Sequence, residues 1–395
     1  MLFNLLFAAI FATVSEILAP YVEKGELPGA ISYFYDNGRE ELTLAGFADK
    51  KAARPMALDS TFMQCSQTKG FCGVTIAILI EEGKIDLDDP VSKYLPEFKT
   101  LWVEDKSTNA DVRTFHKAQN VMTIRNVMNH TAGFPFEAPG KEGGYKGAGW
   151  TRGAPLRNNA AIAAAQPLLF EPGTKEKYSN TGIDVGAAIV EVVTGKKWED
   201  FLKERVLDPL EMHDTSFWPT DEQLARAISI YEYKKDRAAS YVYDYYRCQR
   251  PYNKDGVVAS AGAGLWTTAA DQIKFYKMLM NLGLGDNGVR ILKEETVKKY
   301  LAVSTRPDKM DGYSMGLKAP KAADDNDEAW FGHGGALNTN CMVNYHKKQL
   351  KLWVVQGKSK PRPWDDQVAK YAEEFFNLNN NKAADASDFT GKENN

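Results

Sequence analysis

Two absences narrow the class of protein first: a strong excess of one charge, and an apolar run long enough to cross a membrane. The formal net charge is -3, because 52 Asp and Glu residues slightly outnumber 49 Lys and Arg residues. The lysines are scattered among acidic neighbours and form no basic block of the kind that binds nucleic acid. Beyond residues 1–15, no apolar run approaches the roughly 20 residues that a membrane-spanning helix needs. The sequence therefore predicts no nucleic-acid partner and no integral membrane domain.

Cysteine and histidine are scarce, and neither forms the clusters that hold metals. The four cysteines include no CxxC pair, and the five histidines include no HxxxH or HxH pair. We therefore expect no metal site and no cofactor. We interpret the cysteines as free thiols, with a disulfide as the alternative; they are Cys65, Cys72, Cys248 and Cys341.

Residues 1–15 form an apolar N-terminal segment with few polar interruptions. Its length matches the apolar region of a secretory signal peptide, which spans about 7–15 residues. No Lys or Arg precedes it, and no clear cleavage sequence follows it. We favour export to the periplasm or the medium, with a buried first helix of a cytoplasmic protein as the alternative.

Strand-like segments lie near both ends of the chain. Two such segments flank Asn37-Gly38, a dipeptide typical of a tight β-hairpin, and residues 330–355 alternate as strands do. The stretch from Thr61 to Gly83 predicts a short lead-in and a long buried helix, because it has almost no polar face. Further helices are expected at 183–193, 198–206, 267–282 and 364–376.

These patterns predict an α/β (α+β) fold with one mixed, mainly antiparallel sheet that is flanked by helices and built from both termini. The sheet part of this single unit, residues 16–376, comprises about 16–80 and 256–376. An all-helical domain is inserted at about 81–255. The polar tail at 377–395 predicts disorder. The sequence leaves the oligomeric state open.

Ser66 and Lys69 form the only Ser-x-x-Lys pattern in the chain, at the start of the buried helix. Residues three apart share a face of a helix, so the Lys69 amine can approach the Ser66 hydroxyl. A serine needs an adjacent base to become a nucleophile, and a partly desolvated lysine can be that base. The backbone N–H of Ser66 would also face a developing oxyanion. The alternative is that Ser66 caps the helix while Lys69 extends to water.

Tyr178 and Asn180 form a Tyr-x-Asn pattern after a Pro-Gly turn and before a predicted helix. A phenolate at this exposed helix start could act as a general base. Asn180 could hold a substrate carbonyl or Lys69. The alternative is a half-buried Tyr178 beside an Asn180 that caps the helix.

His333, Gly335 and Ala336 belong to a His-Gly-Gly-Ala sequence at the start of a predicted strand. Glycines there let a ligand approach the backbone closely, and the Ala336 N–H would be a second oxyanion donor opposite Ser66. His333 could hydrogen-bond the substrate or the Ser66–Tyr178 network. The alternative is a glycine bend with an incidental histidine.

The glycine-rich stretch from Phe134 to Pro155 has no periodicity and predicts a long surface loop. We expect this loop to line or cover the site, with Tyr145 and Trp150 as candidate substrate contacts. The alternative is an aromatic loop that packs away from Ser66.

Together these motifs resemble those of the serine β-lactamase and penicillin-binding-protein superfamily, in its class C branch. That branch includes class C β-lactamases, DD-peptidases, D-aminopeptidases and family VIII carboxylesterases. The resemblance covers about residues 16–376 and implies a β-lactamase/transpeptidase-like fold. Besides the three motifs, it rests on LPGAISYFYDNG (27–38), STFMQCSQTKGF (60–71), EEGKIDLDDPVSKYLPEF (81–98), MTIRNVMNHTAGF (122–134), LLFEPGTKEKYSNTG (168–182) and AGAGLWTTAADQIKF (261–275).

The resemblance implies that Ser66 is acylated and that Lys69 and Tyr178 share the proton transfers. Class C β-lactamases usually carry Lys-Thr-Gly where this chain has His-Gly-Gly, as many esterase and peptidase members do. Because a histidine is only partly charged near neutral pH, the anchoring of an anionic lactam should weaken. We therefore predict a serine hydrolase that cleaves small acyl esters through acyl-Ser66 and deacylates with water activated by Tyr178.

Other activities begin with the same acyl-enzyme and stay open. They are β-lactam hydrolysis, cleavage of D-Ala-D-Ala or D-amino-acid peptides, and acyl transfer to an alcohol or amine. An alternative of another class is a penicillin-binding sensor that is acylated without turnover. In each case the partner is a small ester, amide or lactam.

Overall fold

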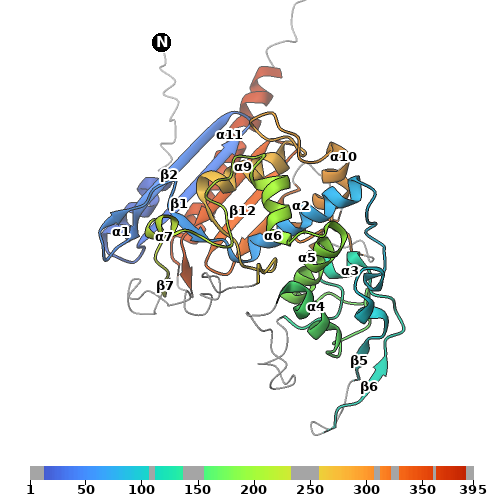
Figure 1. The fold of residues 1–395 in the computed structure, drawn as a ribbon. Coiled ribbons are helices and arrows are strands. Elements are labelled where there is room, and N and C mark those ends of the chain that lie inside the picture. Colours follow the sequence, from blue (N-terminus) through green and yellow to red (C-terminus); the bar gives the residue numbers. More distant parts are fainter. Residues whose placement is uncertain are drawn as a thin grey trace, which may run out of the picture.

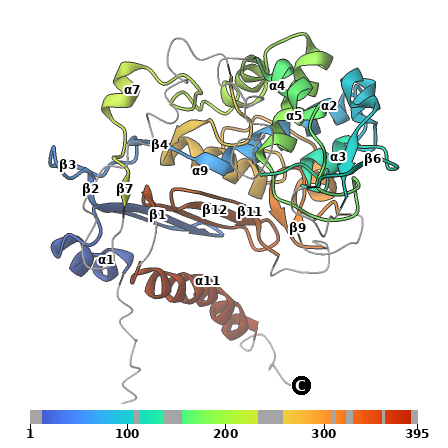
Figure 2. The same ribbon diagram turned by 90° about the horizontal axis from the view of Figure 1, so that it is seen from below.

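The computed structural model describes residues 13–105, 112–136, 155–232, 258–306, 312–321, 329–358 and 362–387. Its centre is a sheet with helices on both faces (Figures 1 and 2). Helices α1 (Val14–Glu23) and α11 (Asp365–Ser387) cover one face, and α2 (Thr68–Glu81) and α9 (Ala269–Met280) lie on the other. This confirms the mixed fold that the sequence predicts.

The main sheet has eight strands in the order β3-β2-β1-β13-β12-β11-β10-β9. Strand β1 pairs antiparallel with β13, with Ile31 opposite Val354, so the two ends of the chain meet in the middle of the sheet. The prediction of a sheet built from both ends is therefore confirmed. The strand bounds are Gly29–Asp36 (β1), Arg39–Asp49 (β2), Arg54–Pro55 (β3), Gly312–Tyr313 (β9), Lys318–Ala319 (β10), Phe331–Gly335 (β11), Thr339–Asn344 (β12) and Gln349–Val354 (β13).

The hairpin between β1 and β2 turns at Asn37 and Gly38, as the sequence predicts. Their φ angles of 46° and 97° both lie in the left-handed region, which a two-residue hairpin turn requires and which Asn and Gly tolerate. Strand β1 is buried almost throughout, because helices cover both faces of the sheet. Its sequence is therefore nearly continuous in apolar residues instead of alternating.

Helices α1 and α11 form an apolar layer on the outer face of the sheet. The Thr13 hydroxyl accepts from the Glu16 N–H at the start of α1, and the Glu16 carboxylate accepts from the Thr13 N–H. Leu18 of α1, Phe34 of β1 and Phe375 of α11 are buried in one cluster.

Helix α11 is longer than predicted. The sequence predicts its end at Phe376 and a disordered tail from residue 377, but residues 377–387 are helical. The prediction rested on polar composition. That stretch contains no proline or glycine to end a helix, and polar residues alone do not stop one.

The long buried helix predicted after Thr61 is α2. It follows strand β4 (Thr61–Met63) and a 3-10 turn, η1 (Cys65–Gln67). Residues Thr68 to Leu79 are all buried, as expected for a helix that is apolar all round. Phe71 stacks on Phe275 of α9 with ring centroids 3.7 Å apart. Helix α2 is therefore a packed central support for the residues at its start.

The region predicted as an all-helical insertion also contains a short hairpin, β5 (Trp102–Glu104) and β6 (Phe115–Lys117). Each strand has three residues, too few for periodicity to reveal. The helices are α3 (Ile124–Met128), α4 (Leu156–Ala164), α5 (Asn180–Thr194), α6 (Trp198–Leu202) and α7 (Asp221–Ala225). The other elements are β7 (Tyr231–Glu232), β8 (Trp266–Thr268), α10 (Glu294–Thr296), β14 (Gly357–Lys358), 3-10 turns at Val91–Lys93 and Pro96–Lys99, and π-type turns at Lys203–Leu207 and Val297–Leu301.

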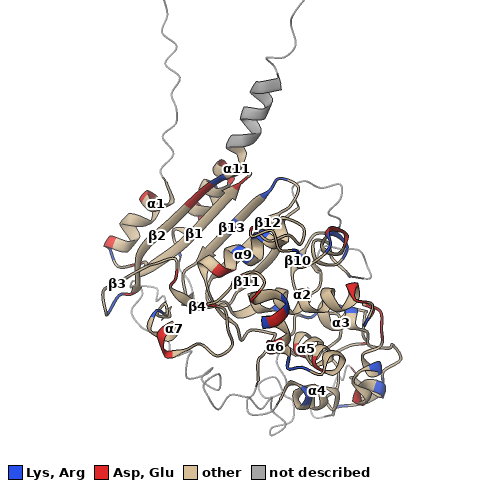
Figure 3. Cartoon of the chain, turned by 45° about the horizontal axis from the view of Figure 1, so that its top comes forward, with Lys and Arg blue, Asp and Glu red and all other residues tan. Residues whose placement is uncertain are grey.

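The outer helices and loops carry charges of both signs. Figure 3 shows Lys and Arg interleaved with Asp and Glu over the described part of the chain. Within that part, no helix combines the length and the apolar character that crossing a membrane demands.

Three of the four cysteines lie in the described ranges. Cys65, Cys72 and Cys341 are buried free thiols, and Cys248 lies outside the described residues. Over the same ranges, no three His, Cys, Asp or Glu side chains group so that they could hold a metal ion.

Candidate active site

Ser66 and Lys69 meet where the η1 turn enters α2. The Lys69 Nζ lies 3.2 Å from the Ser66 Oγ, the approach that their three-residue spacing predicts. Ser66 is partly exposed, whereas Lys69 is 0% exposed. The alternative in which Lys69 extends to water is therefore wrong. Ser66 does not cap the helix either, because the N-cap residue of α2 is Gln67.

Three more groups surround the Lys69 amine. It donates to Asn180 Oδ1 at 2.6 Å and to the Gly262 carbonyl at 2.5 Å, and it lies 4.6 Å from the centroid of the Tyr178 ring. Burial lowers the pKa of Lys69 to about 7, and the Asp184 carboxylate opposes this change. A substantial fraction of this amine is therefore neutral near neutral pH.

The start of α5 presents Asn180 to Lys69. The N-cap residue of α5 is Ser179, whose hydroxyl accepts from the Gly182 N–H at 3.3 Å. The alternative that Asn180 caps the helix is therefore wrong. Because Ser179 fills that role, the Asn180 side chain is available to Lys69, one of the two partners that the sequence suggests for it.

Tyr178 lies between Ser66 and His333. Its phenol is 3.4 Å from His333 Nε2, and His333 Nδ1 lies 2.5 Å from the Gly334 carbonyl oxygen. A carbonyl can only accept, so we assign the proton of the neutral ring to Nδ1, which leaves Nε2 as an acceptor nitrogen that faces the phenol. Burial raises the pKa of Tyr178, while a hydrogen bond with the Ser66 hydroxyl opposes the rise.

His333 is 3% exposed, and burial lowers its pKa to about 3. The Lys69 amine adds to this effect, and the Gly334 carbonyl opposes it. His333 is therefore neutral over the physiological range. The sequence predicts a partly charged histidine at this position, so its ability to attract an anionic substrate is even weaker than expected.

The end of β11 is held against the Ser66 turn. Gln67 Nε2 donates to the His333 carbonyl at 3.1 Å. A Cβ on Gly335 would lie 2.5 Å from the Gln64 carbonyl oxygen, so only glycine fits this close approach. Ala336 is exposed directly after the strand, its backbone N–H faces the buried Cys65 thiol, and its oxyanion role stays a prediction.

The predicted loop contacts Tyr145 and Trp150 lie outside the described residues, so their part in the site stays a prediction. At the described edge of this loop, Phe136 stacks on Tyr178 with ring centroids 5.9 Å apart and an interplanar angle of 20°. Phe136 is 42% exposed, so its ring is accessible beside the catalytic candidates.

Two further rings, which lie outside the three sequence motifs, pack on Tyr178. His130 and Tyr178 have centroids 4.5 Å apart, and Tyr313 lies 4.5 Å from His130 and 5.5 Å from Tyr178. His130 Nδ1 accepts from the Ser179 N–H at 3.3 Å. His130 and Tyr313 fix the Tyr178 ring through tertiary contacts. The sequence offers a signal only for His130, which lies in the segment MTIRNVMNHTAGF.

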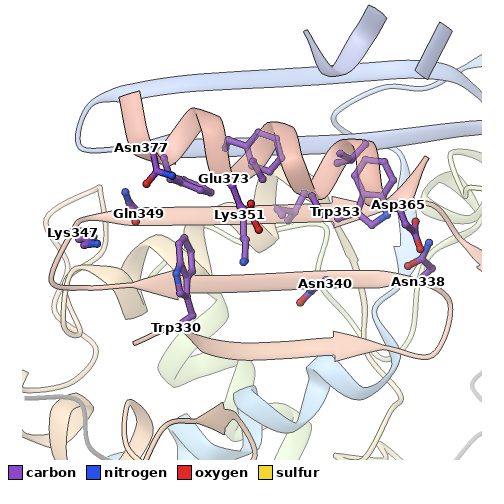
Figure 4. Close-up of a pocket in the computed structure, with 16 residues that line it drawn as sticks. Trp330, Asn338, Asn340, Lys347, Gln349, Lys351, Trp353, Asp365, Glu373 and Asn377 are labelled. Carbon is purple, nitrogen blue, oxygen red and sulfur yellow. The ribbon is translucent and has the colours of Figure 1, made fainter. Parts of the chain in front are cut away.

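A concave feature on the other face of the sheet is separate from this site. It has a volume of about 430 Å³ and lies between α11 and the strands β12 and β13 (Figure 4). Trp330, Trp353 and Lys351 line it, and the Lys351 amine lies 4.4 Å from the Trp330 ring centroid. Ser66, Lys69 and Tyr178 are not among its lining residues, so it does not define the substrate site.

The central antiparallel sheet, the buried helix α2 that directly follows the Ser66 turn and the helical part beside it define the β-lactamase/transpeptidase class of fold. The chain belongs to the Beta-lactamase family, whose model matches residues 14–374.

Similar proteins include an esterase and a hydrolase. Protein Rv1367c of Mycobacterium tuberculosis is 30% identical over 334 residues, which cover 83% of this chain and 78% of that protein. Esterase EstB of Burkholderia gladioli is 30% identical over 224 residues, 54% of this chain and 53% of EstB. Among solved structures, "EstCE1, a hydrolase with promiscuous acyltransferase activity" has a TM-score of 0.68 at 21% identity, and the match covers 87% of this chain and 93% of EstCE1.

Proposed function

We propose that this protein is a serine hydrolase that cleaves small, uncharged acyl esters through a covalent acyl-Ser66 intermediate. The observation that carries the proposal is the buried Lys69 amine, 3.2 Å from a partly exposed Ser66 hydroxyl. Family membership and the similarity to Esterase EstB support the reaction class.

The hydrogen bonds of Lys69 favour its use as a base. A neutral amine has two N–H donors and one lone pair. Its two short contacts, to Asn180 Oδ1 at 2.6 Å and to the Gly262 carbonyl at 2.5 Å, use both donors. The lone pair then remains for the Ser66 hydroxyl proton.

In the first half of the proposed reaction, the Ser66 oxygen attacks the ester carbonyl while its proton passes to Lys69. The oxyanion would be held by the backbone N–H groups of Ser66 and Ala336. The tetrahedral intermediate then collapses, and the leaving alkoxide takes the phenolic proton of Tyr178. The acyl-enzyme is left with a charged Lys69 beside a Tyr178 phenolate.

In the second half, Tyr178 takes a proton from water, and the resulting hydroxide attacks the acyl carbon. The Ser66 oxygen leaves and recovers its proton from Lys69, which restores the starting state. The raised pKa of Tyr178 fits this order, because the residue begins as an acid and becomes a base only while Lys69 is charged.

The substrate preference follows from His333. A neutral imidazole at this position cannot attract the carboxylate of a β-lactam by charge. The exposed ring of Phe136, stacked on Tyr178, offers an apolar contact instead. Both features favour neutral acyl groups.

The first test is a substrate panel with wild type and Ser66→Ala. Wild type should hydrolyse a chromogenic short-chain ester faster than a D-Ala-D-Ala peptide or a chromogenic cephalosporin, and Ser66→Ala should lose all three activities. Ester turnover retained in a folded Ser66→Ala protein would remove Ser66 from the mechanism. A burst of one equivalent without turnover would instead favour a penicillin-binding sensor.

Acyl transfer is the second candidate, because the exposed Phe136 ring beside Tyr178 could hold an alcohol in place of water. The structurally similar EstCE1 is a hydrolase that also has promiscuous acyltransferase activity. Turnover of the ester in the presence of a small alcohol decides between hydrolysis and transfer. An acyl-alcohol product that dominates over free acid would support transfer.

A further inference from the structure

A buried carboxylate near Lys69, that of Asp184, takes no part in the proposed reaction. Asp184 lies on α5, four positions after Asn180, so both side chains project from the same face of the helix. Asp184 is 3% exposed. A buried carboxylate is costly unless it is paired or hydrogen-bonded, so its partners indicate its role.

The partners of Asp184 all belong to one turn. Asp184 Oδ1 accepts from the Gly262 N–H at 3.1 Å and from the Ser260 hydroxyl at 3.2 Å. The carbonyl oxygen of the same residue, Gly262, accepts the hydrogen bond from the Lys69 amine at 2.5 Å. Asp184 therefore binds the N–H of the same residue whose carbonyl oxygen orients the Lys69 amine.

The turn leaves Gly262 little freedom to move. A Cβ on Gly262 would lie 2.8 Å from the Asn180 Cβ, so the backbone presses directly on α5. On its far side, the Leu265 N–H donates to the Thr68 hydroxyl of α2 at 3.2 Å. The turn is thus held between the helix that carries Lys69 and the helix that carries Asp184.

We propose that Asp184 is a positioning residue: it anchors the 260–262 turn so that the Gly262 carbonyl holds the Lys69 amine with its lone pair directed at Ser66. This inference rests on the proposed function. Asn180 holds the same amine directly. Asp184, four residues later on α5, holds it indirectly through the backbone of residues 260–262.

Asp184 also acts on Lys69 by charge. Its carboxylate opposes the lowering of the Lys69 pKa that burial causes. Burial also raises the pKa of Asp184 itself to about 7, while the Gly262 N–H and the charge of Lys69 oppose that rise. The other groups that face this amine are the Cys65 thiol and the Tyr178 ring, and the charge of Lys69 in turn lowers the pKa values of His130 and His333. Removal of the Asp184 charge should therefore lower the pKa of Lys69 further.

The test compares Asp184→Asn with a matched buried acid, Asp271→Asn. Asp271 is 4% exposed and also anchors a loop, accepting from the Asp214 N–H and the Thr215 hydroxyl at 2.9 Å, but it does not contact the site. Both variants should melt at a lower temperature. Only Asp184→Asn should lower kcat, by about 10-fold with little change in KM, and move the acid limb of the kcat profile to lower pH by about 1 unit.

An Asp184→Asn profile that coincides with that of Asp271→Asn would overturn the proposal. If Asp184→Asn does not fold, Ser260→Ala, which removes one donor and keeps the charge, should lower kcat by a smaller factor; an unchanged kcat would count against the anchor.

An NMR titration of the Lys69 amine separates this inference from the proposed function. It is made in the Ser66→Ala background, where no turnover is needed. Addition of Asp184→Asn should lower the titration midpoint, and an unchanged midpoint would refute the link to Lys69. Loss of the proposed function would appear instead as ester turnover that does not depend on Ser66.

Discussion

Lowering the pH from about 8 to about 5 should switch off ester hydrolysis through protonation of Lys69, and the buried Asp184 carboxyl, whose pKa burial raises to about 7, titrates in the same range. Below its pKa of about 7 the amine is charged and has no lone pair for the Ser66 proton. Above that pKa the amine is neutral and can take it. The value of kcat/KM should therefore rise with increasing pH.

The size of the effect follows from the neutral fraction of the amine. With a pKa of about 7, this fraction falls about tenfold for each pH unit below the midpoint. The activity at pH 5 should therefore be about 100-fold below its plateau. His333, with a pKa of about 3, makes no contribution in this range.

The assay is the initial rate of a chromogenic ester from about pH 5 to 9, far below saturation, corrected for spontaneous hydrolysis. His333→Gln provides the control, because its limb should keep the wild-type midpoint even though its rate falls. A flat profile, or a limb that disappears with His333, would refute the assignment of Lys69 as the base.

Three further substitutions test the geometry of the site. Asn180→Ala removes the 2.6 Å acceptor of Lys69, so kcat should fall by about 10- to 100-fold; steady-state kinetics with unchanged kcat would contradict this. Gly335→Ala brings a Cβ within 2.5 Å of the Gln64 carbonyl and should lower both Tm and activity, whereas Gly334→Ala, which meets nothing nearer than 3.5 Å, should be tolerated. Equal melting temperatures would count against the close approach. Tyr178→Phe keeps the ring stack and loses only the phenol, so hydrolysis should slow by about 100-fold or more with little change in Tm; near-normal rates would leave Tyr178 with a packing role alone.

Features of the fold that depend on local patterns were predictable. The Asn37-Gly38 hairpin, the apolar helix after Thr61 and the strands of residues 330–355 each show in the sequence through turn chemistry or periodicity. The β5 and β6 strands were not predictable, because three residues carry no readable period. The length of α11 was misjudged because a polar helix and a polar tail have similar composition.

Some contacts of the site could likewise be predicted from local spacing, and others could not. Ser66 and Lys69 share one helical turn, so their contact could be predicted from spacing alone. Asp184 could have been suspected from its four-residue spacing to Asn180, but its role depends on a turn that folds back from far along the chain. The ring contact between Tyr313 and Tyr178 is likewise a purely tertiary feature.

Intact-protein mass spectrometry during turnover of a slowly deacylated ester tests the central claim most directly. Wild type should show a mass increase equal to one acyl group, and peptide mapping should place it on the peptide that contains Ser66. The increase should be absent from Ser66→Ala. Steady ester turnover without any adduct, or an adduct that persists in Ser66→Ala, would contradict the acyl-Ser66 mechanism.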